Sequence, residues 1–249
     1  MAAFAADIAH HLETVAAERE RRTEAPGLLG KVTALKAYQQ RRFAHTYDDL
    51  LASPRHGPAA RYFLDELYGP KDFSARDAQF ARVAPAIARV FPSEVAGTLV
   101  ILSELHALSE ALDTAMGLEL ASERVAASDY IAAWQDVGRA ADRNRQIDLT
   151  LSIATQLDRI TRLPLLRNAL RLMRRPARAA GLADLQRSLE TGFDTFRAMK
   201  GADEFIAFIA SRERTLAAAL FVAGRGGAGG DAATNEALAV LPAAEGDPG

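Results

Sequence analysis

The chain has 249 residues, enough for one large or two small domains with a substantial core. Its formal net charge of −2 gives no overall field that would attract nucleic acid, so a nucleic-acid partner is not expected. Cysteine is absent, which excludes disulfides, thiolate metal ligands and cysteine nucleophiles and fits a cytoplasmic protein.

The N-terminal segment 1–22 has the pattern of an amphipathic helix, with apolar residues at helical spacing. It has no basic stretch before its apolar part and carries Asp7 inside it, so it does not resemble a secretory signal. The longest apolar run, Val95–Leu102, is much shorter than the roughly 20 residues of a membrane span. We therefore expect a soluble protein of bacterial type, without a transmembrane segment.

Helices are predicted next at residues 32–51 and 59–68, because apolar residues recur there every three or four positions. The second should end at Gly69-Pro70, since glycine suits the position after a helix and proline cannot continue one. The chain restarts near Ser74, and a further helix ends near Phe91.

The segment 92–116 is predicted to be the central helix. Pro92 fits its first turn, and its apolar stripe is the longest in the chain. That stripe contains Val95, Leu99, Leu102, Leu105, Leu108, Leu112 and Met116. A helix this apolar belongs in the middle of a bundle.

The remaining helical patterns cover 129–162, shorter segments around Pro164 and Pro176, and then 182–199 and 202–222. Whether 129–162 is one continuous helix is open. From residue 223 to 249 glycine, alanine and acidic residues dominate, and such a tail is expected to be disordered. The sequence thus predicts an all-α, single-domain bundle of about seven to ten helices at 30–222, preceded by the helix at 1–22.

A polar face interrupts the predicted central helix. Its three residues are spaced i, i+4 and i+7, and the inward stripe of 129–162, continued beyond Trp134, brings three more toward them. This candidate polar pocket consists of His106, Glu110, Asp113, Asn144, Arg145 and Asp148. It predicts a ligand or acid–base site, with a structural ion-pair layer or a surface stripe as the alternatives.

No metal or cofactor is predicted. The five histidines are scattered, and no acidic residue stands three positions before His106, as a helical di-iron site requires. Gly224–Gly229 matches G-x-G-x-x-G but lacks a preceding strand, so a nucleotide site is not expected. Haem held by a single histidine remains compatible with the sequence.

A basic stretch lies between Arg159 and Arg178, with seven arginines and no acidic residue. Four of the arginines fall on one helical face, opposite Leu166, Leu170 and Met173. This candidate anionic-partner face consists of Arg167, Arg171, Arg174 and Arg178. It suits an anionic membrane surface or an acidic partner; the alternative is a solvated helix face.

Three segments carry a resemblance to a known family. They are YFLDELYGPKDFSARDAQFAR at 62–82, LHALSE at 105–110 and GFDTFRAMKGA at 192–202. Together they resemble an uncharacterised proteobacterial family of all-helical proteins, over roughly residues 30 to 222. The resemblance implies one helical domain and brings no activity or catalytic residue with it.

Three functions follow as hypotheses. The first is a non-enzymatic interaction or regulatory protein with a protein partner, because no catalytic motif is present. The second is a small-molecule or cofactor-binding protein, or an enzyme, that uses a polar pocket around His106 and Glu110. The third is peripheral binding of an anionic membrane or acidic partner through residues 159–178. The sequence does not decide the oligomeric state.

Overall fold

A long helix, α6 (Ser93–Glu119), runs through the middle of the computed structural model. The structure describes residues 2–66, 78–80, 82–83, 93–163, 165–224 and 231–243. This part of the chain contains eleven helices, ten of them seven residues or longer, and no strand. The predicted all-α class and the predicted central helix are both confirmed.

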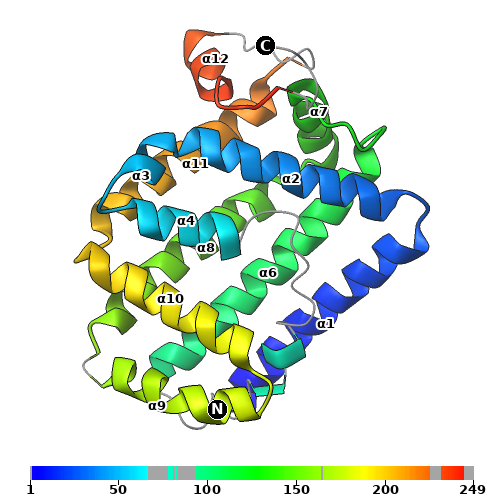
Figure 1. The fold of residues 1–249 in the computed structure, drawn as a ribbon. Helices are drawn as coiled ribbons and strands as arrows, with labels where there is room; N and C mark the ends of the chain where they lie inside the picture. The colour runs from blue at the N-terminus through cyan, green and yellow to red at the C-terminus, as the bar shows by residue number, and fades with distance from the viewer. Residues whose placement is uncertain are drawn as a thin grey trace.

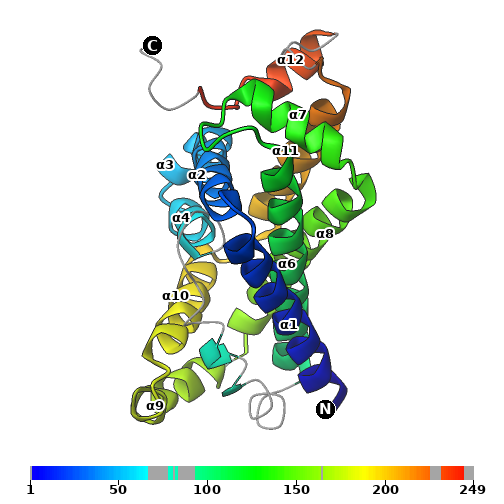
Figure 2. The same cartoon turned by 90° about the vertical axis from the view of Figure 1, so that its right-hand side faces the viewer.

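Two layers of helices face each other (Figure 2). One layer consists of α6, α8 (Ala140–Thr161) and α11 (Asp203–Val222), with α1 (Ala2–Glu24) packed along α6. The other consists of α2 (Leu28–Thr46), α4 (Gly57–Glu66) and α10 (Ala183–Met199). The short α3 (Asp48–Ala52) connects α2 to α4.

The ends of the two layers are closed by shorter helices (Figure 1). At one end lie α7 (Ala127–Val137) and α12 (Ala232–Leu238), and at the other lies α9 (Leu166–Ala179). Each end has its own cluster of buried apolar residues, the first around Trp134 and Leu216 and the second around Leu166 and Phe193. The core is therefore distributed around the space between the layers.

The predicted helical segment at 129–162 is two helices. Gly138 has φ 63° and Arg139 has φ 54°, so two consecutive residues adopt positive φ between α7 and α8. Glycine reaches this region at little cost, and one following residue can be held there by its surroundings. The break changes which face of the second helix points inward. The predicted helix at 32–51 is likewise divided at Tyr47, between α2 and α3.

The structure differs from the predicted disordered tail. Residues 231–243 contain α12, whose N-terminus is capped by the Asp231 side chain, which accepts a hydrogen bond from the Thr234 amide. Leu238 is buried in the same cluster as Leu216 and Tyr38, and the Tyr38 hydroxyl donates to the Pro242 carbonyl at 3.1 Å. This part of the tail completes the core; residues 225–230 and 244–249 lie outside the described residues.

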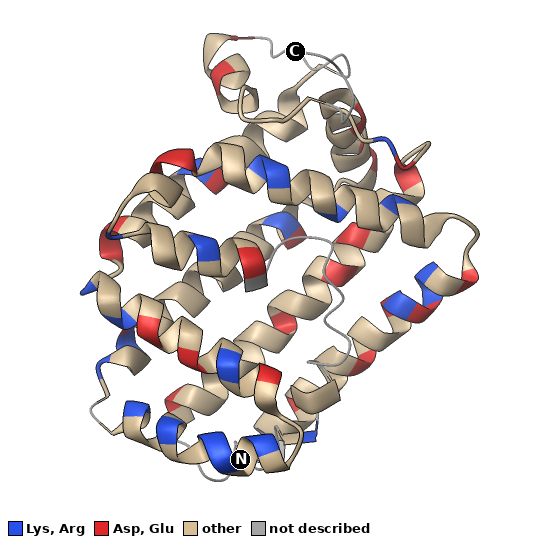
Figure 3. Ribbon diagram, viewed as in Figure 1, with Lys and Arg blue, Asp and Glu red and all other residues tan. Residues whose placement is uncertain are grey.

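Charged residues are spread over most of the helices, and arginines gather along α9 (Figure 3). Among the described helices, α6 alone has the length and apolar composition of a membrane span, as a core helix of a soluble protein also does. In the structure it contacts α1, α2 and α8.

Candidate functional site

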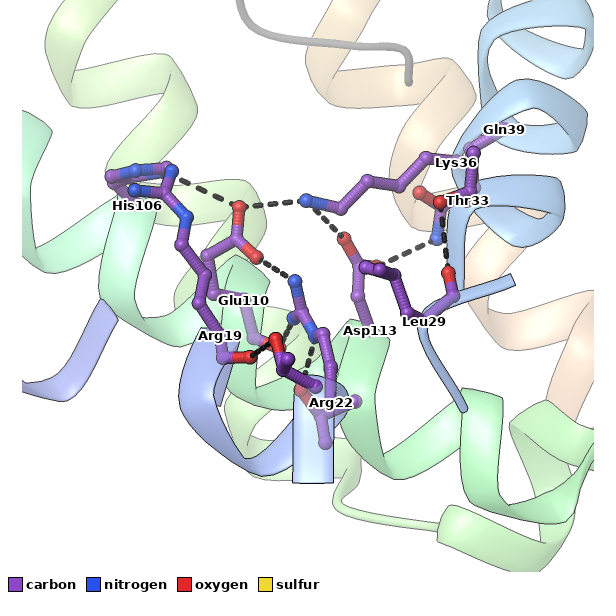
Figure 4. Close-up of polar contacts among 11 residues, drawn as sticks. Arg19, Arg22, Leu29, Thr33, Lys36, Gln39, His106, Glu110 and Asp113 are labelled. Carbon is purple, nitrogen blue, oxygen red and sulfur yellow. Dashed lines mark hydrogen bonds and ion pairs between the residues drawn. The ribbon is translucent and has the colours of Figure 1, made fainter. Parts of the chain in front are cut away.

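The polar residues of α6 meet cations from α1 and α2. Glu110 is 4% exposed, and one of its carboxylate oxygens pairs with the Arg22 guanidinium. Its other oxygen accepts a hydrogen bond from Lys36 Nζ at 2.6 Å. Arg22 also donates to Thr114 Oγ1 at 2.8 Å, so α1, α2 and α6 are joined at one point (Figure 4).

Asp113 continues this cluster one turn further along α6. Its Oδ1 accepts a hydrogen bond from Gln39 Nε2 at 3.0 Å, and its Oδ2 lies 3.9 Å from Lys36 Nζ. Lys36 therefore lies between the two carboxylates, as Figure 4 shows. His106 Nδ1 lies 4.0 Å from Glu110 Oε1, with the ring partly exposed.

The two carboxylates respond oppositely to this environment. Burial opposes ionisation of Glu110, but Lys36 and Arg22 together outweigh it and lower the pKa to about 2. Burial raises the pKa of Asp113, since Lys36, the Gln39 hydrogen bond and Arg22 compensate only in part and the neighbouring Glu110 charge adds to the effect. Glu110 is thus fixed as a structural anion.

Half of the predicted polar pocket is wrong. His106, Glu110 and Asp113 do lie together, but Asn144, Arg145 and Asp148 are on the exposed side of α8. Arg145 pairs with Glu104 and Asp148 pairs with Arg214, both at the surface. The break at Gly138 and Arg139 is the reason, because a stripe extrapolated from α7 does not keep its register in α8.

The inward face of α8 brings other residues to α6. Arg143 is 2% exposed, and Gln146 Nε2 donates to Ser109 Oγ at 2.8 Å. Further along, Leu149 and Ile153 pack on Leu105. The residue numbers of the α6 partners fall from Ser109 to Leu105 as those of α8 rise from Gln146 to Ile153. The two helices are therefore antiparallel.

A cavity of about 290 Å³ lies between the two layers. This is close to the lower end of the range of about 300–1,000 Å³ that is typical of ligand sites. Its charged end is lined by Lys36, Arg42, Glu110, Asp113, Arg143 and Glu213. Its apolar part is lined by Leu99, Leu102, Leu105, Ile153, Leu157, Ile160, Leu166 and Phe193.

The polarity of the cavity follows the two long helices. Along α6 the lining changes from apolar at Leu99 and Leu102 to polar at Glu110 and Asp113. Along α8 it changes in the opposite sense, from Arg143 through Thr150 to apolar residues near the C-terminus. Because the helices are antiparallel, the two polar ends coincide, and the cavity is amphipathic.

Sequence reasoning missed Arg22, Lys36, Gln39 and Arg143 as members of the site. Lys36 and Gln39 stand at helical spacing within an inward stripe that includes Leu35 and Tyr38. Polar residues between inward-facing apolar ones are the sequence pattern that could have indicated Lys36 and Gln39 as members of the site. Arg143 had no comparable signal, because its face is set by the turn before it.

No three His, Asp or Glu side chains of the described residues gather as a metal site. The five histidines include His11, whose Nδ1 lies 2.9 Å from Ser103 Oγ, and His106 beside Glu110. Haem held by a single histidine was not predicted and stays an alternative.

The predicted anionic-partner face is divided in the structure. Arg167 pairs with Asp194, and Arg174 pairs with Glu190, so these two side chains attach α9 to α10. Arg171 and Arg178 are exposed, as is Arg175. The exposed arginines of α9 without an ion pair to α10 in the described chain are therefore Arg171, Arg175 and Arg178.

Comparison with known proteins places the chain in a family. A family model described as a domain of unknown function (DUF8198) matches residues 18–225. The chain belongs to this family. The match contains the polar cluster around Glu110 and the charged end of the cavity, from Arg22 in α1 to Glu213 in α11. No curated protein and no solved structure matches the chain.

The match confirms that the chain belongs to an uncharacterised family. It extends further toward the N-terminus than the range of roughly 30 to 222 expected from the sequence, and so includes the last turns of α1. Most of the 62–82 segment that carried the resemblance lies outside the described residues; its first residues, Tyr62–Glu66, are in α4.

Proposed function

We propose that this protein binds a small amphipathic organic molecule in the cavity between its two helical layers. The supporting observation is the cavity itself, with a charged end at α2 and α6 and an apolar end toward α9 and α10. Ligand sites are commonly apolar cavities with a few convergent polar groups. This favours the second of the three hypotheses over a general interaction role, and a protein partner stays a prediction.

The electrostatics of Glu110 argue against its use as a general base. A general base should have a pKa near the working pH, and the pKa of Glu110 is lowered to about 2. Both of its oxygens are already occupied by Arg22 and Lys36. The proposal is thus a soluble, cytoplasmic, non-enzymatic binding protein.

The test is native mass spectrometry of the full chain purified from fresh lysate. We expect a species heavier than the polypeptide, whose excess mass is released on denaturation and recovered in an organic extract. A matched pair of variants on α6 tests whether the bound molecule lies in the cavity. Leu102→Trp fills the cavity and should lose the excess mass, whereas Leu118→Trp, on the exposed side, should keep it.

Two results would reject this function. One is a purified protein without excess mass that also shows no saturable binding to a panel of amphipathic anions, cations and neutral molecules. The other is bound material retained equally by both variants, since this would place it outside the cavity.

A second candidate function, binding to an anionic membrane surface, is favoured by α9. Leu165 and Leu172 are 76% and 78% exposed, and Met173 is also exposed. Arg171 and Arg175 stand beside Leu172 in the same helix. Exposed leucines flanked by arginines are typical of helices that lie in a lipid interface.

Vesicle sedimentation tests this second function. Vesicles containing phosphatidylglycerol should bind the protein in low salt and release it as salt rises, while phosphatidylcholine vesicles should not bind. The double variant Leu165→Ala/Leu172→Ala should weaken binding, and Leu29→Ala, an exposed leucine on α2, should not. Equal binding by both variants, or to both lipids, would reject it.

A further inference from the structure

Arg143 occupies an unusual position in the cavity wall. It lies in the first turn of α8, is 2% exposed and lines the charged end. Its Nη2 donates to Met116 Sδ at 2.9 Å and its Nη1 to Gln146 Oε1 at 3.3 Å. Its Nε has no hydrogen-bond partner, and no Asp or Glu of the described chain is within ion-pair distance.

The other lysine and arginine side chains of the cavity wall have carboxylate partners. Lys36 has Glu110, and Arg42 has Glu213 at 2.5 Å. A buried charge needs a partner, because its removal from water is unfavourable. Sulfur and amide oxygen are neutral acceptors that compensate only part of this cost. Burial accordingly lowers the pKa of Arg143.

Trp134 supports Arg143 from α7. The guanidinium carbon lies 3.9 Å from the centroid of the indole ring, a close cation–π arrangement that fixes the plane of the guanidinium. The indole N–H of Trp134 is buried and has no hydrogen-bond partner among the described residues, and Trp134 also lines the cavity. Two stacked side chains of the cavity wall therefore have buried donors without a partner in the described chain.

We propose that Arg143 and Trp134 bind the carboxylate of an amphipathic organic acid, whose apolar chain extends along α6 and α8 toward α9. This inference rests on the proposed function, of which it specifies the ligand class. The apolar chain would contact Leu105, Ile153 and Leu157. A charge-assisted hydrogen bond to the guanidinium Nε would supply the missing partner.

The charge of the site favours a monoanion. The carboxylates of Glu110, Asp113 and Glu213 line the same end of the cavity as Arg143. They repel a second negative charge, so a phosphate dianion is disfavoured relative to a carboxylate. A neutral head group would leave the guanidinium without its counter-charge.

The test compares three probes with the same tail: decanoate, decanol and decyl phosphate. Each is titrated by calorimetry into the delipidated full-length protein. Decanoate should bind at least about tenfold more tightly than decanol, as a hydrogen bond to a charged group implies. Decyl phosphate should bind more weakly than decanoate.

Arg143→Met keeps an unbranched apolar stem, which is shorter than that of arginine, and removes the guanidinium with its charge. It should weaken decanoate binding by about tenfold to a hundredfold and affect decanol binding much less, so that retained decanol binding also shows that the variant is folded. Arg145→Met is the matched control, because Arg145 lies in the same helix, is exposed and pairs with Glu104. It should leave both affinities unchanged.

Trp134→Phe is a second variant in case Arg143→Met does not fold. It keeps an aromatic ring and removes the N–H, and it should weaken the binding of decanoate but not that of decanol.

The inference is overturned if decanol or decyl phosphate binds as tightly as decanoate, or if both site variants bind decanoate normally. In either case the proposed function still stands. If none of the three probes binds, the inference is overturned, and the mass-spectrometric test decides the proposed function separately.

Discussion

Glu110 shows at residue scale how one buried carboxylate joins three helices. It is the shared partner of Arg22 from α1 and Lys36 from α2, and the backbone carbonyl of Glu110 accepts a further hydrogen bond from Arg22 at 2.5 Å. A buried pair contributes little net stability relative to apolar residues, but removing one member leaves the others without a counter-charge. The cluster therefore constrains how α1, α2 and α6 are placed.

Replacing Glu110 by glutamine should lower the free energy of unfolding by about 3–5 kcal/mol, because the buried Arg22 loses its carboxylate partner and Lys36 keeps only the more distant Asp113. Glu104→Gln is the matched control on the same helix, since Glu104 pairs with Arg145 near the surface, and it should cost less than about 1 kcal/mol. Urea denaturation of both variants measures the difference. Equal losses would show that the cluster does not have this role.

Acid should remove the contribution of Glu110 to the free energy of unfolding. Its pKa in the folded protein is about 2, below the ordinary value of 4.5, so its stabilisation is complete above pH 4.5 and is lost as the pH falls toward 2. Asp113 acts in the opposite sense, since its raised pKa favours the folded state at low pH. The advantage of the wild type over Glu110→Gln should shrink by about 3 kcal/mol over this interval. A pH-independent advantage would contradict this assignment.

At the scale of elements, the closeness of α2 and α6 depends on a glycine. A Cβ at Gly117 would lie 2.5 Å from Val32 Cγ2, so the two helices approach too closely for a larger residue. This approach brings Lys36 and Gln39 within reach of the carboxylates of α6.

Gly117→Ala should therefore destabilise the protein by about 1–3 kcal/mol, as overpacking does. Gly97→Ala, in the same helix with no described heavy atom within 4 Å of a Cβ, should instead stabilise it by up to about 1 kcal/mol through helix propensity. Thermal unfolding measures both changes. Stabilisation by both substitutions would mean that the helices separate without cost.

At the scale of the whole molecule, the two layers leave a cavity, and the C-terminal segment closes one end of the structure. Leu238 of α12 packs in the cluster that contains Trp134, Tyr38 and Leu216. Trp134 also lines the charged end of the cavity, so α12 packs in the same apolar cluster as a residue of the cavity wall.

Leu238→Ala should lower the free energy of unfolding by about 2–5 kcal/mol, since it removes a buried leucine. Leu29→Ala, at a leucine that is 55% exposed, should change it by less than about 0.5 kcal/mol. Chemical denaturation compares the two. A loss as small as that of the control would show that α12 is not part of the folded core.

The sequence by itself determined the helical class, the central helix and the polar face of His106, Glu110 and Asp113. These features depend on side chains three or four positions apart, and the helix period places such residues on one face. The same reasoning predicted the limits of α10 and α11 to within a residue.

Only the tertiary structure decided which residues meet that face. Lys36 and Glu110 are separated by 74 residues, and Arg22 and Glu110 by 88, so no local period relates them. The inward side of α8 depends on two positive φ angles at Gly138 and Arg139, which shift its register relative to α7. The burial of Leu238 depends on an apolar surface formed by α2, α7 and α11 together, and composition alone does not contain that surface.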